Sequence, residues 1–369
     1  MNITTLFIDA SVRCEPGVEK IQSRLGMTGT VVQDAAEVFD WVSRAEDPIQ
    51  RGKETLFLTR NRGAFVRECP GTRAYICCGY KILHIGAFCT MDCSYCILQA
   101  YFHPPVLQFF MNHGDMIEEL QAEFQKPVIS RIGTGEFTDS MIWERPFDFS
   151  EVLVPLFAAQ HRAVLELKTK TTDIQRLKPY VHHRKTICAW SLNTERVIHE
   201  QERRTASLEA RLRAAATCES WGYPLAFHFD PVVLYDGCED EYRQVIRKLF
   251  SYVSAENVVW ISVGTFRFIP ALKTIIQNRF SDSTIVYGEF ISGMDTKMRY
   301  FKPLRREFYR KMVGWIKDAA PDVLVYYCME DDDIWEKTLG FTPESRGGLF
   351  RMLDESAARH CGVVEKRYI

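Results

Sequence analysis

Short apolar runs alternate with amphipathic stretches along most of the chain. After residue 126, strand-like runs recur at 127–133, 163–168, 186–191, 224–229, 258–263 and 323–328. Stretches with helical periodicity separate them, for example at 206–220 and 240–252. Strands that alternate with helices predict βα units and a parallel sheet, either open or closed into a barrel. Functional side chains in such folds lie at the carboxyl ends of the strands.

The N-terminal part of the chain predicts a small α/β unit. Residues 3–9 have the pattern of a strand, and residues 17–26 and 33–43 have the pattern of helices. Residues 47–54 (DPIQRGKE) predict a polar connector. We therefore expect three parts: a small N-terminal α/β domain at 1–75, a main domain at 76–335 and a C-terminal extension at 336–369.

Composition and charge exclude several classes of protein. Of the 369 residues, 46% are hydrophobic and 25% are charged, as in ordinary globular proteins. No apolar stretch approaches the roughly 20 residues of a membrane span, and the N-terminus lacks the features of a secretion signal. We therefore predict a cytoplasmic protein with no membrane partner. The net charge of −2 carries no overall signature of nucleic-acid binding.

The chain contains twelve cysteines, a high number for its length. Because a secretion signal is missing, they indicate a reducing compartment and a metal site rather than a set of disulfides. Two apolar segments, 56–61 and 81–88, lead into a loop that holds three of them close together. The scattered ones are predicted to be small buried apolar residues: Cys14, Cys69, Cys188, Cys218, Cys238, Cys328 and Cys361.

The clustered cysteines are Cys89, Cys93 and Cys96, with C-x3-C-x2-C spacing. Ordinary iron–sulfur sites use four cysteines, and no fourth stands at matching spacing. Three thiolates can hold three irons of a 4Fe–4S cluster and leave one iron open. An open iron can bind S-adenosylmethionine and reduce it, which predicts a radical enzyme. The alternative is a zinc site, for which His103 is the nearest fourth ligand.

Polar residues follow several predicted strands and are candidates for binding S-adenosylmethionine. Gly135 allows close backbone approach, and the carboxylate of Glu136 can accept from the methionine ammonium. Lys170 can pair with the methionine carboxylate, while Ser191 and Asn193 suit ribose hydroxyls or that carboxylate. The alternatives are an ordinary turn for the glycine–glutamate pair and a helix cap for Ser191 and Asn193.

Three residues near the cysteine loop are candidates for catalysis. Cys77 and Cys78 stand next to each other just before the loop, and a thiol on the substrate side can donate a hydrogen atom. Tyr95, between the second and third clustered cysteines, suits the adenine side of the site. The alternatives are two small residues on opposite faces of a strand for the cysteines, and shielding of the cluster for Tyr95.

These motifs together resemble the spore photoproduct lyase family. The resemblance rests on C-x3-C-x-Y-C with Leu98-Gln99, Gly135-Glu136, Lys170-Thr171, Ser191-Leu192-Asn193 and Gly222-Tyr223-Pro224-Leu225. It implies a partial (β/α)6 radical SAM barrel, a 4Fe–4S cluster, and cleavage of S-adenosylmethionine to methionine and a 5′-deoxyadenosyl radical. In the lyase that radical abstracts hydrogen from a thymine–thymine photoproduct in DNA. The resemblance thus implies DNA or a nucleotide-like substrate, and an electron donor such as reduced flavodoxin or ferredoxin.

Two positions depart from the family. The lyase donates hydrogen from a cysteine in a Cys-Thr-Ser-Asp block, where this chain has Phe137 in the stretch 136–140, and it has a tyrosine directly after the third cluster cysteine, where this chain has Ile97. Phenylalanine has no weak S–H bond, so the lyase mechanism cannot operate unchanged. The donor therefore stays open among Cys77, Cys78, Tyr95 and Cys328. The substrate also stays open, with a peptide, an RNA base or a metabolite as alternatives, and a non-catalytic metal-binding scaffold as the remaining one.

Overall fold

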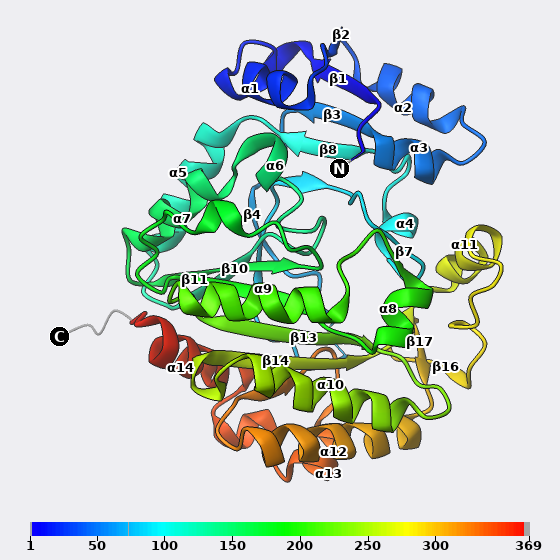
Figure 1. The fold of residues 1–369 in the computed structure, drawn as a ribbon, viewed down its shortest axis with the longest axis vertical. Helices are drawn as coiled ribbons and strands as arrows, with labels where there is room; N and C mark the ends of the chain where they lie inside the picture. Colours follow the sequence, from blue (N-terminus) through cyan, green and yellow to red (C-terminus); the bar gives the residue numbers. More distant parts are fainter. Residues whose placement is uncertain (1, 73, 365–369) are drawn as a thin grey trace.

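A curled eight-stranded sheet forms the centre of the protein in the computed structural model, which describes residues 2–72 and 74–364 (Figure 1). The strand order is β18-β14-β13-β11-β10-β9-β5-β4. The bounds are β4 Val66–Glu68, β5 Lys81–Leu83, β9 Ser130–Gly133, β10 Ala163–Thr169, β11 Thr186–Ser191, β13 Leu225–Val232, β14 Val258–Thr265 and β18 Val325–Tyr327. All neighbouring pairs are parallel except β4 with β5, which confirms the predicted parallel sheet.

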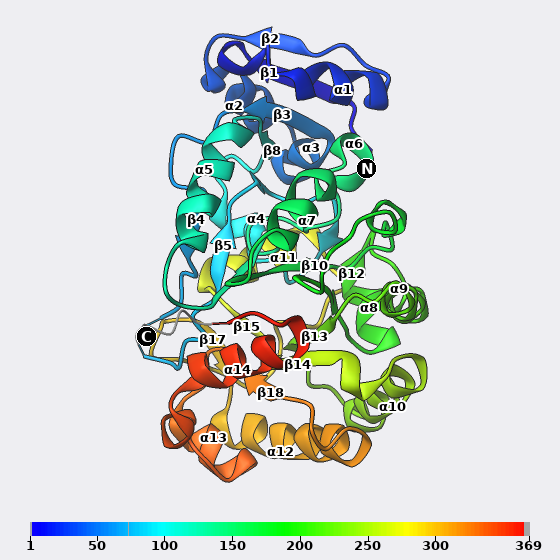
Figure 2. The same cartoon turned by 90° about the vertical axis from the view of Figure 1, so that its left-hand side faces the viewer.

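The helices of the βα units pack on the outer face of this sheet (Figures 1 and 2). They are α5 His113–Phe124, α7 Ser150–Ala158, α9 Leu208–Ser220, α10 Cys238–Tyr252, α12 Lys302–Ala319, α13 Asp332–Leu339 and α14 Leu349–Cys361. Every residue of β11 and β14 is buried, as expected for strands covered on both faces. The inner face of the sheet carries the polar side chains described below.

A second, five-stranded sheet lies above the first at the N-terminal end of the chain, in the order β2-β1-β3-β8-β6 (Figure 1). Its strands are β1 Thr5–Asp9, β2 Thr30–Val32, β3 Thr55–Thr59, β6 Gly86–Ala87 and β8 Leu107–Phe110. Helices α1 Pro16–Leu25 and α2 Ala35–Ser43 confirm the predicted α/β unit. Because β6 and β8 follow residue 75, this sheet also uses residues from beyond the expected boundary. The division at 75 and 335 remains a proposal.

The prediction of a connector at residues 47–54 is wrong, because this segment contains helix α3 Pro48–Glu54. Asp47 caps the helix by accepting a 2.9 Å hydrogen bond from the backbone N–H of Gln50, and Pro48 occupies its first turn. Gly52 weakens the helical pattern of the sequence, but the structure leaves no room for a side chain at this position. A Cβ atom at that position would lie 1.5 Å from the carbonyl oxygen of Pro105.

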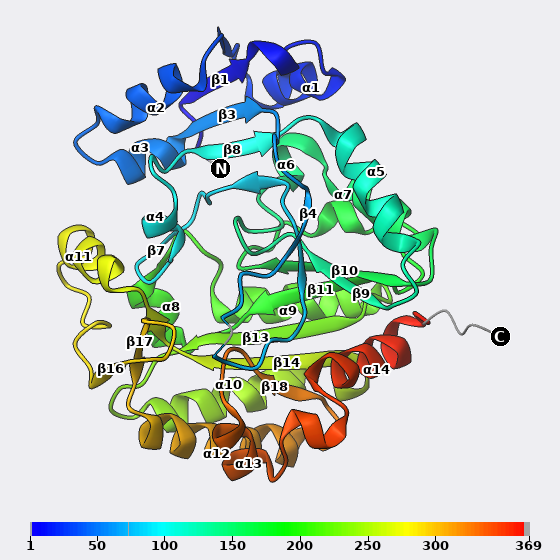
Figure 3. The ribbon, with the colours of Figure 1, turned by 180° about the vertical axis from the view of Figure 1, so that it is seen from behind.

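Several short elements surround the cysteine loop. The predicted segment 81–88 divides into β5 and β6, which belong to different sheets. The loop itself contains β7 Asp92–Cys93 and is followed by α4 Leu98–Tyr101. Figure 3 shows α11 Pro270–Arg279 beside α4, with the strands β16 Phe290–Ser292 and β17 Met298–Tyr300 on the same side of the molecule. Across 2–72 and 74–364, no helix is both long enough and apolar enough to cross a membrane.

Candidate active site

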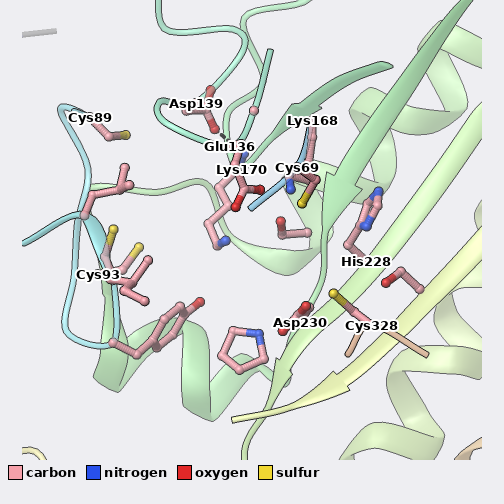
Figure 4. A pocket seen from close by; sticks show the side chains of 18 of the residues that line it. Cys69, Cys89, Cys93, Glu136, Asp139, Lys168, Lys170, His228, Asp230 and Cys328 are labelled. Carbon is pink, nitrogen blue, oxygen red and sulfur yellow. Dashed lines mark hydrogen bonds between the residues drawn. The ribbon is translucent and has the colours of Figure 1, made fainter. Parts of the chain in front are cut away.

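A cavity of about 320 Å³ opens at the carboxyl ends of the barrel strands, between the sheet and the cysteine loop (Figure 4). Its wall includes residues from or directly after β9, β10, β11, β13, β14 and β18. This position is the one expected for the functional site of a parallel α/β fold. Cys89, Cys93 and Cys96 all line it, so the structure brings the three predicted ligands to one cavity.

The cysteine loop is held from behind by two buried polar side chains. Lys53, at the end of α3, donates from Nζ to the carbonyl oxygen of Cys89 at 3.2 Å and also to that of Met91. Gln99, at the start of α4, donates from Nε2 to the carbonyl oxygens of Cys93 and Ser94, both at 3.1 Å. These bonds engage the backbone carbonyls, and the sulfur atoms remain available.

Two further elements complete the support of the loop. Strand β7 pairs antiparallel with β12 (Glu202–Arg203), with Cys93 opposite Glu202. Arg279, at the end of α11, donates from Nη1 to Asp92 at 3.1 Å and also to Gln99. The backbone of the cysteine loop is therefore held by contacts from α3, α4, β12 and α11.

The three cysteines supply the thiol donors of an iron–sulfur cluster, but within residues 2–72 and 74–364 no three His, Cys, Asp or Glu side chains are gathered closely enough to hold one metal ion. Burial raises the pKa of the Cys89 thiol to about 12 and that of Cys93 well above its usual value. The thiolate is the form that binds metal. These buried cysteines therefore lose their protons only when a bound cation compensates the negative charge. The backbone N–H of Met91 points to Sγ of Cys89 at 3.4 Å, which adds a donor for its negative charge. His103 is not part of the cavity wall and its Nε2 lies 2.9 Å from the carbonyl oxygen of Ala100, which disfavours the zinc alternative.

Four of the five residues predicted to bind S-adenosylmethionine line the cavity: Gly135, Glu136, Lys170 and Ser191. Figure 4 shows Glu136 and Lys170 between the cluster cysteines and the opposite wall. Asn193 lies outside the cavity wall. Its Nδ2 donates to the carbonyl oxygen of Pro231 at 2.8 Å, and its Oδ1 accepts from the hydroxyl of Tyr242 at 2.6 Å. These contacts do not support the predicted cosubstrate role of Asn193, which stays a prediction.

Asp139 positions the backbone of Lys170. Its Oδ2 accepts from the N–H of Lys170 at 2.9 Å, and its Oδ1 accepts from the hydroxyl of Thr169 at 2.8 Å and the N–H of Met141 at 2.9 Å. Burial raises the pKa of Asp139, although these three donors favour its charged form. The carboxylate thus ties the loop after β9 to the end of β10.

Strand β10 contributes charged side chains to the inner face of the barrel. Glu166 accepts from the indole N–H of Trp260 at 3.0 Å and lies 2.9 Å from Nε2 of His228. Burial opposes ionisation of Glu166, but its interactions with His228, Lys168 and Trp260 hold its pKa at about 2. Burial likewise opposes the charge of Lys168, but Glu136 and Glu166 outweigh it and raise the pKa of this lysine. The cavity therefore holds fixed charges of both signs.

The far wall carries an ion pair and further residues, of which the sequence had indicated only Cys328, as one candidate hydrogen-atom donor. Arg267 donates to both carboxylate oxygens of Asp230 at 3.1 Å, and its Nη2 lies 3.4 Å from Sγ of Cys328. Cys69 and Lys297 also line the cavity. Cys69 and Cys328, expected to be buried apolar residues, thus face the site. Only β10 carried a sequence pattern that could have indicated site residues. Charged side chains occupy every second position in and just after this strand, at Glu166, Lys168 and Lys170.

The predicted catalytic candidates differ in their positions. Cys78 lines the cavity and Cys77 does not. Tyr95 lines the cavity, but its hydroxyl donates to Glu202, which is paired with Arg211 at 2.6 Å. Burial raises the pKa of Tyr95 well above its usual value. Nζ of Lys170 lies 5.9 Å from the centre of the Tyr95 ring.

The stretch compared with the lyase's donor block shows a different residue in the cavity. Phe137 is not part of the wall, and its ring packs against His84 at 4.9 Å and Phe102 at 6.4 Å between ring centres. Glu136 lines the cavity instead. Ile97, the second departure, lies on the cavity wall. The loop after β9 therefore offers the carboxylate of Glu136 to the cavity, while Phe137 packs outside it.

Comparison with known proteins supports one family. A family model described as spore photoproduct lyase matches residues 77–301. The spore photoproduct lyase of Clostridium acetobutylicum is 26% identical over 254 residues, covering 68% of this chain and 71% of that protein. That of Bacillus subtilis is 22% identical over 206 residues, covering 54% and 60%.

Solved structures support the fold. A spore photoproduct lyase double mutant with bound AdoMet and dinucleoside spore photoproduct matches with a TM-score of 0.78 at 18% identity, over 89% of this chain and 100% of that one. Spore photoproduct lyase complexed with dinucleoside spore photoproduct matches with a TM-score of 0.76 at 17% identity, over 88% and 99%. These likenesses confirm the predicted radical SAM fold with its partial barrel.

Proposed function

Because the chain belongs to the spore photoproduct lyase family, we propose that its cavity binds a thymine photoproduct of DNA, or a nucleotide-like lesion of the same chemistry. The protein is a radical SAM enzyme that uses a 4Fe–4S cluster and S-adenosylmethionine. The single observation that carries the proposal is the shared cavity. It is lined by the three cysteines on one side and by Glu136, Lys168 and Lys170 facing them.

Different residues of the cavity have different proposed roles in binding the cluster and S-adenosylmethionine. Cys89, Cys93 and Cys96 would hold the cluster, which when bound would supply the electron for cleavage of S-adenosylmethionine into methionine and a 5′-deoxyadenosyl radical. Glu136 accepts from the methionine ammonium, and Lys170, positioned by Asp139, pairs with the methionine carboxylate.

We further propose a reduced flavodoxin or ferredoxin-type protein as the electron donor and the cytoplasm as the location. Free thiols line the site, and such thiols persist in reducing compartments. Carbon–carbon bond cleavage of the lesion is the reaction type, as in the family name.

The test is anaerobic reconstitution with iron and sulfide, followed by dithionite, S-adenosylmethionine and a dinucleoside spore photoproduct. We expect about four irons per chain, formation of 5′-deoxyadenosine and release of two thymidines for each lesion cleaved. Cys93→Ala should abolish both products.

Two results would contradict parts of the proposal. 5′-Deoxyadenosine without lesion cleavage, together with no salt-dependent binding to damaged duplex, would move the enzyme to a non-DNA substrate. No 5′-deoxyadenosine from wild-type protein that carries four irons would overturn the radical reaction itself.

A further inference from the structure

Three cysteine thiols with no part in cluster binding line the same cavity: Cys69, Cys78 and Cys328. Figure 4 shows Cys69 and Cys328 across the cavity from Cys89 and Cys93, with Glu136 and Lys170 between the two groups. A substrate seated in this space meets the cluster on one side and thiols on the other.

Backbone hydrogen bonds hold this wall in place. The N–H of Cys69, just after β4, donates to the carbonyl oxygen of Tyr80 at 3.0 Å. The N–H of Cys328, just after β18, donates to the carbonyl oxygen of Val263 at 3.1 Å. Because the N–H of Ile76 donates to the carbonyl oxygen of Glu330 at 3.1 Å, the loops before β5 and after β18 lie side by side.

The proposed reaction needs a hydrogen-atom donor on this wall. A radical that abstracts hydrogen from the substrate leaves a product radical, which must regain one hydrogen atom. Glu136 and Phe137 occupy the stretch where the family's donating cysteine lies, and neither has an S–H bond. The donor therefore has to come from another element.

We propose that Cys69 is this donor, an inference that rests on the radical reaction proposed above. Its side chain lies near Glu136, which lines the cavity together with Thr138 and Asp139 of the stretch compared with the lyase's donor block.

The protonation state of Cys69 is compatible with this role, as is that of Cys328, whose pKa burial raises to about 11, so the choice between them rests on position. Burial, with Glu136 adding to it, raises the pKa of Cys69 to about 12, so the S–H bond is present at neutral pH. Cys77 differs, because its hydrogen bond with Cys78 lowers the pKa of Cys77 to about 6, and Cys77 lies outside the cavity.

The step balances as a hydrogen-atom transfer. The S–H bond of Cys69 breaks and a C–H bond forms on the product radical, which leaves a thiyl radical on Sγ. That thiyl is one electron and one proton short of the thiol. The flavodoxin- or ferredoxin-type donor that reduces the cluster supplies the electron, and water supplies the proton.

The test is the reaction in D2O with mass spectrometry of the released thymidines. Wild type should place one deuterium in the product, because the S–H of Cys69 exchanges with solvent. Cys69→Ala and the isosteric Cys69→Ser should still form 5′-deoxyadenosine, while repaired product falls at least tenfold and loses its deuterium. Cys14→Ala, which changes an exposed thiol, is the matched control and should behave as wild type.

Other outcomes overturn the assignment. Deuterium retained in both Cys69 variants but lost in Cys328→Ala would make Cys328 the donor. Product without deuterium from wild type would place the donated hydrogen on a non-exchangeable carbon. Absence of lesion cleavage by wild type, with 5′-deoxyadenosine still formed, would contradict the proposed substrate instead, and so is distinguishable.

Discussion

Replacing Lys53 with methionine should uncouple the N-terminal unit from the cysteine loop. Lys53 is 2% exposed, and its Nζ serves the carbonyls of Cys89 and Met91. Methionine fills similar volume but leaves both carbonyls without this donor, and an unpaired buried acceptor costs about 1–3 kcal/mol. Asp92, 3.8 Å from Nζ, also loses a partner. Relief from burying an ammonium offsets part of this, so we expect a net loss of about 2–4 kcal/mol in the free energy of unfolding.

Urea unfolding of the apo-protein and iron content after gel filtration measure this effect. We expect an earlier unfolding midpoint and fewer than four irons per chain for Lys53→Met. Lys20→Met is the matched control, because Lys20 pairs with Glu151 at 3.0 Å on the surface, and exposed pairs contribute about 0–1 kcal/mol. Equal midpoints for the two variants, with full iron in both, would refute the idea that Lys53 supports the loop.

The remaining predictions concern the cosubstrate and pH. Asp139→Asn presents an amide N–H toward donors that need an acceptor, so the dissociation constant for S-adenosylmethionine, measured by equilibrium dialysis, should rise about tenfold. Burial lowers the pKa of His84 to about 4, below the roughly 6.5 of an unfolded chain. The unfolded state is therefore protonated first, and stability that is complete above pH 6.5 falls as the pH drops toward 4. His84→Phe should remove up to about 2–3 kcal/mol of that loss, seen as a flatter profile of urea midpoint against pH; an unchanged slope would contradict the assignment.

Local pattern predicted those parts of the site whose chemistry is confined to a short segment. The spacing of Cys89, Cys93 and Cys96 lies within eight residues, and the structure brings all three to one cavity. Gly135, Glu136, Lys170 and Ser191 end buried strands, and parallel strands bring their carboxyl ends to one edge.

The remaining parts of the site depend on contacts between residues that are far apart in the sequence. Glu166 stands inside a buried strand, and its charge is stabilised by His228, 62 residues away. Asn193 has the right position after β11, but Tyr242, 49 residues later, engages its amide. A single sequence contains no record of either contact. For the same reason, the scattered Cys69 and Cys328 gave no sign that β4 and β18 would end at one cavity.

The supports of the cysteine loop have a consequence for the order in which the protein is made. Lys53 and Gln99 are synthesised shortly before and shortly after the cysteine loop. Arg203 of β12 and then Arg279 are synthesised much later. The last of these partners appears only after 279 of 369 residues have been synthesised. Until residue 279 has been made, the loop lacks the contacts of Arg279 with Asp92 and Gln99. The complete set of supports for the cysteine loop therefore forms late in synthesis or after it.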